Sequence, residues 1–398
     1  MAVRKGYKQT EVGVIPEDWE TYSLRDLVSY VKGYPFSAND YKSDGVRVLR
    51  VSDTTYDRIK SDGVFIESLK AKQFRKWELR EGDLVVSTVG SKPPMYDSMV
   101  GKATYISKYH AGILLNQNAV VLRSKKVCLQ RILHNHFRQP RYLSHIECIF
   151  RGNANQASIT LVELFQYAIP LPPTLAEQEA IAGALSDADA WIESLEQLIA
   201  KKRQIKQGAM QELLTGKRRL PGFSGKWETK RLGDVLRVRH GKSQKEIAVE
   251  NGRYPILASG GEIGRTNTAL YSGPSVLIGR KGTIDAPQYS ESPFWSVDTL
   301  FFTEIDKDHC AKWFYYRFCL VQWRKYNEAS GVPSLNARTI EAIELALPEL
   351  KEQTAIASVL SDMDTEIEAL ESKLAKACEI KQGMMQELLT GRIRLIEN

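Results

Sequence analysis

Residues 177–216 read EQEAIAGALSDADAWIESLEQLIAKKRQIKQGAMQELLTG, and residues 352–391 read EQTAIASVLSDMDTEIEALESKLAKACEIKQGMMQELLTG. The two stretches align without a gap at an offset of 175, and 26 of the 40 aligned positions are identical. An internal repeat of this kind indicates one structural unit that the chain uses twice.

Apolar residues in each copy recur at alternating steps of four and three, which is the spacing of a coiled-coil seam. The seam residues are Ile181, Leu185, Ala188, Ile192, Leu195, Ile199, Ile356, Leu360, Met363, Ile367, Leu370 and Leu374. Each copy ends in Leu-Leu-Thr-Gly, where the glycine suits a left-handed helix cap. About 38 helical residues predict a helix on the order of 57 Å long. A domain core needs no helix of that length, so a spacer is favoured over a buried core stripe.

Charge is distributed unevenly along the 398 residues, which suffice for two or more domains. The net charge is +8 in residues 1–172 and +6 in residues 217–347, but −3 in residues 173–216 and −4 in residues 348–398. This division predicts that the globular parts bind a polyanion while the helices bind each other or a protein. The alternative is a surface charge set by solubility alone.

Cysteine usage and hydropathy favour a cytoplasmic protein. The chain has five cysteines and no C-x-x-C pair, which argues against a disulfide framework and for a reducing compartment. No apolar run approaches 18 residues, so neither export nor a membrane span is expected. His134, His136, His145 and Cys148 lack the strict spacing of a zinc site.

A globular segment precedes each long helix. Both segments open with W-E-T-x-x-L-x-D, at Trp19–Asp26 and at Trp227–Asp234, although their interiors differ. The first segment mixes strand-like stretches at 46–51, 83–89 and 119–123 with a more helical stretch at 125–149. The second predicts strands at 253–257, 276–279 and 299–303, and an aromatic-rich helix at 311–326. The chain is therefore predicted to be an α+β protein with domain 1 at 1–172, a helix at 173–216, domain 2 at 217–347 and a helix at 348–398.

These paired motifs resemble the specificity (S) subunits of type I restriction-modification systems. The resemblance rests on the E-Q-x-A-I-A helix starts, the Q-E-L-L-T-G helix ends and the domain openings. It extends to Gly82-Asp83-Leu84-Val85 with Val100-Gly101-Lys102, and to the segment from Leu277 to Thr283. It implies two target-recognition domains separated by two long helices that form an antiparallel coiled coil, with a pseudo-twofold internal repeat.

The resemblance also implies partners and cofactors. Such a subunit reads an asymmetric bipartite target in double-stranded DNA, with one recognition domain for each half-site. It holds two methyltransferase (M) subunits through the coiled coil and, in some systems, restriction (R) subunits. AdoMet would then bind to the methyltransferase partner, ATP and Mg to the restriction partner, and no cofactor to this chain.

The order of the segments indicates a circularly permuted repeat. Gly216 is followed by a linker that leads to Trp227, whereas only seven residues follow Gly391. The missing continuation, VGVIPEDWE, stands near the N-terminus. If the helices are antiparallel, the two chain ends are expected to meet.

Motifs for catalysis on DNA are not evident. A DNA adenine methyltransferase needs an Asp/Asn-Pro-Pro-Tyr/Phe motif, and the nearest match is Lys92-Pro93-Pro94-Met95. Gly260, Gly261 and Gly264 form G-G-x-x-G, which favours a turn because no strand-loop-helix context follows. We therefore predict a DNA-recognition subunit without catalytic residues. The alternatives are a stand-alone DNA methyltransferase and a coiled-coil adaptor that does not bind DNA.

Candidate DNA-binding residues are polar or basic residues in glycine-flanked loops, because Arg and Lys suit guanine or phosphate while Asn and Gln suit adenine. In domain 1 they are Lys32, Tyr34, Ser52, Asp53, Ser91, Lys92, Asn116, Gln117, Asn118, Arg151, Asn153, Asn155 and Gln156. In domain 2 they are His240, Lys242, Ser243, Ser259, Arg280, Lys281, Ser334, Asn336 and Arg338.

Overall fold

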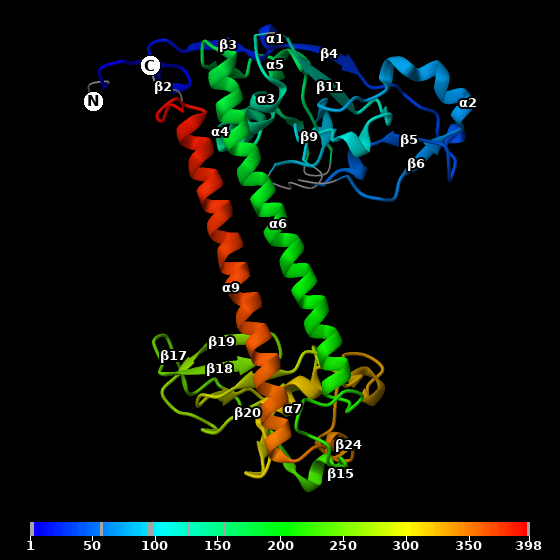
Figure 1. The fold of residues 1–398 in the computed structure, drawn as a ribbon, viewed down its shortest axis with the longest axis vertical. Coiled ribbons are helices and arrows are strands. Elements are labelled where there is room, and N and C mark those ends of the chain that lie inside the picture. Colours follow the sequence, from blue (N-terminus) through cyan, green and yellow to red (C-terminus); the bar gives the residue numbers. More distant parts are fainter. Residues whose placement is uncertain (1–3, 56–58, 94–98, 126, 154–155, 396–398) are drawn as a thin grey trace. The chain divides into compact units, whose positions relative to one another are not determined.

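The computed structural model describes residues 4–55, 59–93, 99–125, 127–153 and 156–395. The chain divides into two compact units. Unit 1 comprises residues 1–193 and 375–398, and unit 2 comprises residues 194–374. Each unit combines a globular domain with a part of each of the two long helices (Figure 1).

The domain of unit 1 consists of short strands and short helices. Its elements are β1 Tyr7–Thr10, β2 Gly13–Pro16, β3 Glu20–Ser23, α1 Leu24–Leu27, β4 Val28–Lys32, β5 Val46–Leu49, β6 Val64–Ile66, α2 Ser68–Ala71, β7 Leu84–Ser87, β8 Val89–Gly90, β9 Ala103–Tyr105, β10 Leu114–Leu115, β11 Ala119–Ser124, α3 Gln130–His136, α4 Pro140–Ile149, β12 Arg151–Gly152, β13 Ala157–Ser158, α5 Leu161–Leu164 and β14 Ala168–Leu171.

A four-stranded antiparallel sheet in the order β4-β11-β7-β9 lies at the centre of this domain. Successive side chains of a strand point to opposite faces of the sheet. Leu84 of β7 accordingly belongs to the same buried cluster as Ile132 of α3 and Ile181 of the first long helix. Its neighbour Val85 packs on the other face, in a cluster with Leu49 of β5. The sheet therefore has a core on each face.

The domain of unit 2 has the same plan. Its elements are β15 Glu228–Arg231, β16 Leu236–His240, β17 Ala248–Val249, β18 Tyr254–Ala258, β19 Gly261–Thr266, β20 Ser275–Gly279, β21 Gln288–Ser290, β22 Trp295–Ser296, β23 Leu300–Ile305, α7 Ala311–Phe318, α8 Ala337–Glu341 and β24 Glu344–Leu347. The central sheet has the order β16-β23-β20-β21. Ile278 clusters with Trp313 of α7 and Leu360 of the second long helix, whereas Leu277 clusters with Ile256 of β18. The different sequences thus produce equivalent two-faced cores.

Two predicted helices are wrong in length. The stretch predicted as helical at 125–149 contains two helices, α3 and α4, because Pro140 begins a new helix as its first residue. The predicted helix at 311–326 ends at Phe318, and Trp323–Tyr326 forms a separate 3₁₀ turn. The indole of Trp323 is buried and donates to the carbonyl of Phe318 at 2.9 Å, so core packing ends the helix early.

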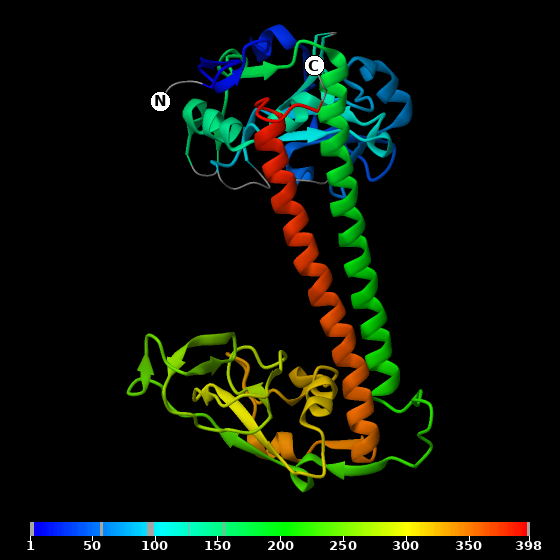
Figure 2. The ribbon, with the colours of Figure 1, turned by 60° about the vertical axis from the view of Figure 1, so that its left-hand side comes forward.

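The repeated stretches form the long helices α6, Leu175–Leu213, and α9, Leu350–Leu388. In each unit the two long helices lie side by side and run in opposite directions (Figure 2). In unit 2, α7 packs between this helix pair and the strands of the domain. Lys381 pairs with Asp189 in unit 1, and Lys206 pairs with Asp364 in unit 2. The 175-residue offset relates the two ion pairs, so the same motif positions fix the helix register twice.

The structure places the predicted seam residues in buried or half-buried positions. Those that are buried are Ile181, Leu185, Leu195, Ile199, Ile356, Leu360 and Ile367. Those that are half-buried are Ala188, Ile192, Met363, Leu370 and Leu374. Although each helix has 39 residues, no helix in the described part of the chain is apolar enough to cross a membrane.

The repeated Glu-Gln pair joins each long helix to its surroundings. The Gln178 amide donates to the carbonyl of Pro172 at 3.3 Å, and the Gln353 amide donates to that of Pro348 at 2.8 Å. Glu352 is buried and accepts from the Arg219 guanidinium at 2.6 Å. Conservation of Glu-Gln between the two copies therefore has a structural cause.

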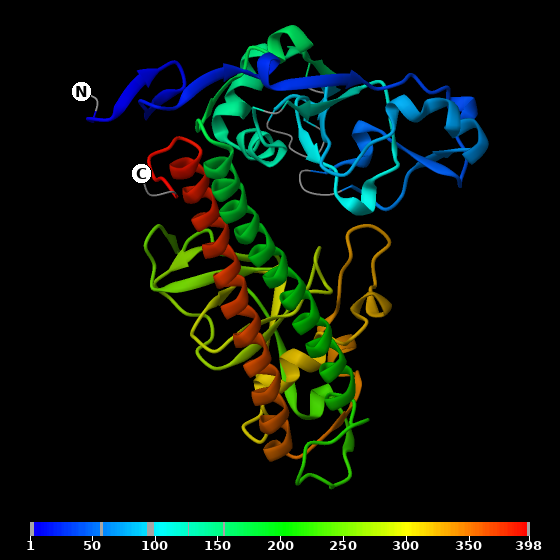
Figure 3. The ribbon, with the colours of Figure 1, turned by 45° about the horizontal axis from the view of Figure 1, so that its top comes forward.

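The N-terminal and C-terminal segments meet within unit 1, as predicted from the permuted repeat (Figure 3). The Tyr7 hydroxyl donates to the carbonyl of Gly391 at 3.2 Å. Arg394, the equivalent of Arg219, donates to Glu177 at 2.7 Å and to Asp18 at 3.1 Å. The arginine-glutamate pair thus occurs once in each unit. In unit 1 the arginine comes from the C-terminal segment and its second partner, Asp18, from the N-terminal segment.

Replacing Glu352 with Gln is expected to lower the free energy of unfolding by about 1.5–3 kcal/mol, because the change removes the charge from a buried hydrogen-bonded group. Urea denaturation measures the effect. Glu371→Gln is the matched control, since Glu371 forms an exposed ion pair with Arg203, and such pairs contribute about 0–1 kcal/mol. Equal shifts for the two variants would show that the buried pair adds no more stability than an exposed one.

Candidate nucleic-acid interface

Loops from three strands meet at one edge of the unit 1 sheet. β11 is antiparallel to both β4 and β7, so the ends of β4 and β7 lie beside the start of β11. Gly33 follows β4, and a Cβ atom there would lie 1.8 Å from the carbonyl oxygen of Asn116. The backbone N–H of Thr88, after β7, donates to the carbonyl of Asn118 at 2.9 Å. The candidate residues that flank these strands are therefore neighbours.

A small sheet in the order β12-β13-β8 adds a second group of candidates to this edge. Ser91 and Lys92 follow β8, Asn153 follows β12, and Gln156 precedes β13. Lys92, Asn153 and Gln156 are exposed, as are Lys32, Ser52, Gln117 and Asn118. Candidate Asn155 lies outside the described residues.

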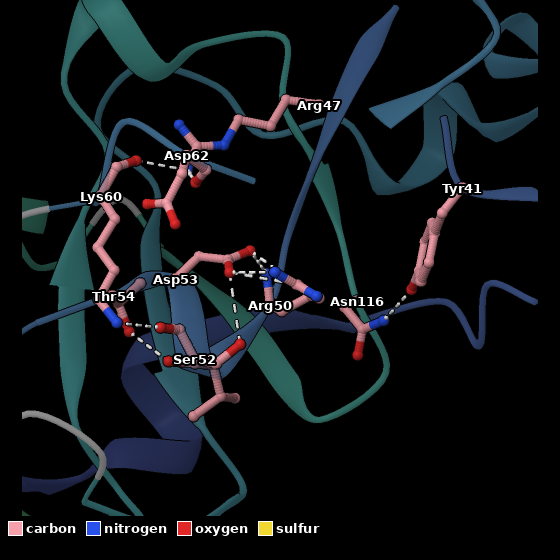
Figure 4. A network of polar contacts seen from close by, with 10 residues as sticks. Tyr41, Arg47, Arg50, Ser52, Asp53, Thr54, Lys60, Asp62 and Asn116 are labelled. Carbon is pink, nitrogen blue, oxygen red and sulfur yellow. Dashed lines mark hydrogen bonds and ion pairs between the residues drawn. The ribbon is translucent and has the colours of Figure 1, made fainter. Parts of the chain in front are cut away.

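Several candidates of unit 1 have their polar or aromatic groups engaged within the protein. Tyr34 packs in an aromatic cluster, 4.5 Å from Trp77 between ring centroids. The buried Asn116 amide donates to the Tyr41 hydroxyl at 3.2 Å (Figure 4). Arg151 forms an ion pair with Glu163 at 2.6 Å. Tyr34 and Asn116 therefore support the loops, whereas the Arg151 side chain is still 71% exposed.

Asp53 is also engaged, and its partner Arg50 is a residue that the sequence analysis missed. The Asp53 carboxylate is buried and accepts from two nitrogens of the Arg50 guanidinium (Figure 4). This hydrogen bonding raises the pKa of Arg50 above its ordinary value. The signal in the sequence was an arginine three residues before an aspartate, directly after a strand.

The corresponding edge of unit 2 has the same geometry. Gly241 follows β16, and a Cβ atom there would lie 1.9 Å from the carbonyl oxygen of Val297, just before β23. Lys281, after β20, forms a β-bridge with Ser334. A Cβ atom on Gly282 would lie 4.0 Å from the Ser259 hydroxyl. Loops that are distant in the sequence therefore meet at this edge as well.

The edge in unit 2 carries three exposed cations. Lys242, Lys281 and Arg338 are exposed, and their side chains form no ion pair with any described residue. Their charges are therefore available to a polyanion. The remaining candidates differ in their surroundings, and Ser259 and Ser334 are half-buried. Ser243 is exposed, His240 packs against Phe301, Arg280 donates to the carbonyl of Asp298, and Asn336 caps α8.

The G-G-x-x-G motif lies at a hairpin, with Gly260 in the turn and with Gly261 and Gly264 in β19. Ala258 of β18 pairs with Gly261 of β19, and Gly261 has a φ of 112°. A strand follows the turn where a cofactor loop would need a helix, so the predicted turn is confirmed. Among the described residues, no group of three or more His, Cys, Asp or Glu side chains is arranged to hold a metal ion.

Comparisons with known proteins agree with this repeated architecture. A family model described as the type I restriction modification DNA specificity domain matches residues 16–207 and 224–378. The MjaVIII type I restriction enzyme specificity subunit of Methanocaldococcus jannaschii is 24% identical over 444 residues, which cover 96% of this chain and 94% of that protein. The crystal structure of a type I restriction-modification S subunit from M. genitalium aligns with a TM-score of 0.64 and 15% identity, covering 98% of each chain. These comparisons match the chain over nearly its whole length.

Proposed function

The chain belongs to the family of type I restriction-modification DNA specificity subunits, and we propose that it reads an asymmetric bipartite DNA target and catalyses no reaction itself. One observation carries the proposal. Two domains of the same topology bring different polar and basic loops together at corresponding sheet edges. Different side chains at equivalent positions favour two recognised blocks of different sequence.

The long helices are proposed to bind the methyltransferase partners. The helical segments carry net negative charge, in contrast to the basic domains. In unit 2, Leu198 and Ile205 of α6 are 39% and 48% exposed, and their spacing of seven places them on one face of the helix. Such exposed apolar side chains fit a protein partner. On this proposal the partners also carry the cofactors, AdoMet on the methyltransferase and ATP with Mg on any restriction subunit.

Selection of bound sites from a random double-stranded DNA pool tests the proposal. The full chain with its methyltransferase partner is expected to enrich two short, different sequence blocks separated by a spacer without sequence preference. Mapping methylated adenines in the source genome provides an independent check, since the same two blocks should flank or contain them. A single block, a palindrome or the absence of enrichment would contradict the proposal.

AdoMet binding distinguishes the proposed recognition subunit from an enzyme. The isolated chain is expected to show no calorimetric signal on titration with AdoMet, whereas the complex with the methyltransferase should bind it. Stoichiometric AdoMet binding by the isolated chain would instead support a methyltransferase activity of its own. If neither the chain nor its complex shows salt-dependent DNA binding, the result would favour an adaptor that does not bind nucleic acid.

A further inference from the structure

Arg50 lies at the edge of unit 1 where the candidate loops meet. β5 and β10 are parallel, and Leu49 pairs with Leu115. Arg50 and Asn116 are the residues that follow this pair, and the backbone N–H of Asn116 donates to the carbonyl of Leu49 at 3.1 Å. Arg50 therefore enters its loop beside the segment that contains the exposed Gln117 and Asn118.

The Arg50 guanidinium is held in one orientation. Its Nη2 donates to Asp53 Oδ1 at 2.7 Å and its Nε donates to Oδ2 at 3.1 Å. The carboxylate is itself fixed, because Oδ2 also accepts from the backbone N–H of Arg50 at 3.0 Å. The Asp53 side chain is 5% exposed, whereas that of Arg50 is 37% exposed. Asp53 thus holds one side of the guanidinium, and the N–H groups of Nη1 take no part in this pair.

Two lysines hold the turn that contains this pair. Lys102 is buried, and its ammonium donates to the carbonyl of Thr54 at 2.7 Å. The Lys60 ammonium donates to the carbonyl of Ser52 at 2.9 Å (Figure 4). Burial of a lysine ammonium carries a large desolvation cost. The two lysines fix the carbonyls of this turn, and the turn in turn holds Arg50 in place.

We propose that Arg50 reads a guanine in the block recognised by unit 1, with Asp53 and Lys102 as positioning residues. This inference rests on the proposed DNA-recognition function. Guanine presents two acceptors, O6 and N7, which match two parallel N–H donors of a guanidinium, whereas adenine presents a donor in place of O6. A phosphate contact fits less well, because Asp53 neutralises the charge of Arg50 and would repel a phosphate.

Site selection with Arg50→Lys tests this inference in the full chain with its methyltransferase partner. Lysine keeps the positive charge but lacks the planar pair of donors. Discrimination against other bases should fall roughly 5- to 150-fold at one G·C pair of one block, which is the range for a lost bidentate contact. Asp53→Asn should weaken discrimination at the same base pair, because it releases the guanidinium.

The second block is the internal control, since its unchanged enrichment shows that the variant chain is folded and assembled. Unchanged discrimination at every base pair would overturn the assignment of Arg50, as would equal weakening on all sequences. The assignment would also be overturned if the block that responds to Arg50→Lys contains no G·C pair in the wild-type target. If the wild-type complex enriches no sequence, the proposed function itself fails, which is a distinguishable result.

Discussion

Replacing Leu195 with Ala is expected to lower the free energy of unfolding by about 2–5 kcal/mol, because the side chain is buried on α6 and the substitution leaves a cavity. Leu195 is 7% exposed. Urea denaturation followed by circular dichroism measures the change as a shift of the midpoint at constant slope.

Leu198→Ala is the matched control for this prediction. It makes the same chemical change three residues later on the same helix, at a side chain that is 39% exposed. Its effect should stay within about 0.5 kcal/mol, as for other surface substitutions. Similar shifts for both variants would mean that the 4-3 spacing of apolar residues does not identify the buried face of α6.

The long helices could be predicted from the sequence because their signal is local and occurs twice. The seam and the C-terminal glycine lie within one stretch of 40 residues in each copy, and a proline, Pro172 or Pro348, stands just before that stretch. The shorter helices were less predictable, since tertiary contacts decide where they end. Trp323 continues the aromatic pattern of α7, yet its burial against the carbonyl of Phe318 places it outside that helix.

The candidate site shows the same limit. Residue type and flanking glycines led to loops that the structure brings together at one edge of each sheet. The state of a single side chain could not be predicted in this way, because it depends on a partner from elsewhere. Asn116 is occupied by Tyr41, which is 75 residues earlier. Asp53 appeared as a candidate contact, whereas Arg50, three residues earlier, has the more exposed side chain of the pair.

Removing three cations from the edge of unit 2, in the variant Lys242→Ala/Lys281→Ala/Arg338→Ala, is expected to weaken DNA binding by roughly 10²- to 10³-fold at 0.1 M salt. Each exposed cation that neutralises a phosphate releases about one counterion, so the salt slope should fall by about three. Fluorescence anisotropy with a fixed duplex, titrated at several salt concentrations, measures both quantities. Because phosphate contacts carry no sequence information, the preferred target should stay the same.

The matched control removes the same charge from a long helix, in the variant Lys201→Ala/Lys202→Ala/Arg203→Ala. Lys202 and Arg203 form ion pairs with Glu366 and Glu371 of α9, so they are engaged within the coiled coil. This variant should keep the wild-type salt slope, although the net charge of the chain falls by the same amount. If both variants reduce the slope equally, DNA responds to the overall charge of the chain. The assignment of DNA binding to the sheet edge of unit 2 would then be wrong, because Lys242, Lys281 and Arg338 would contribute no more to phosphate binding than other cations of the chain.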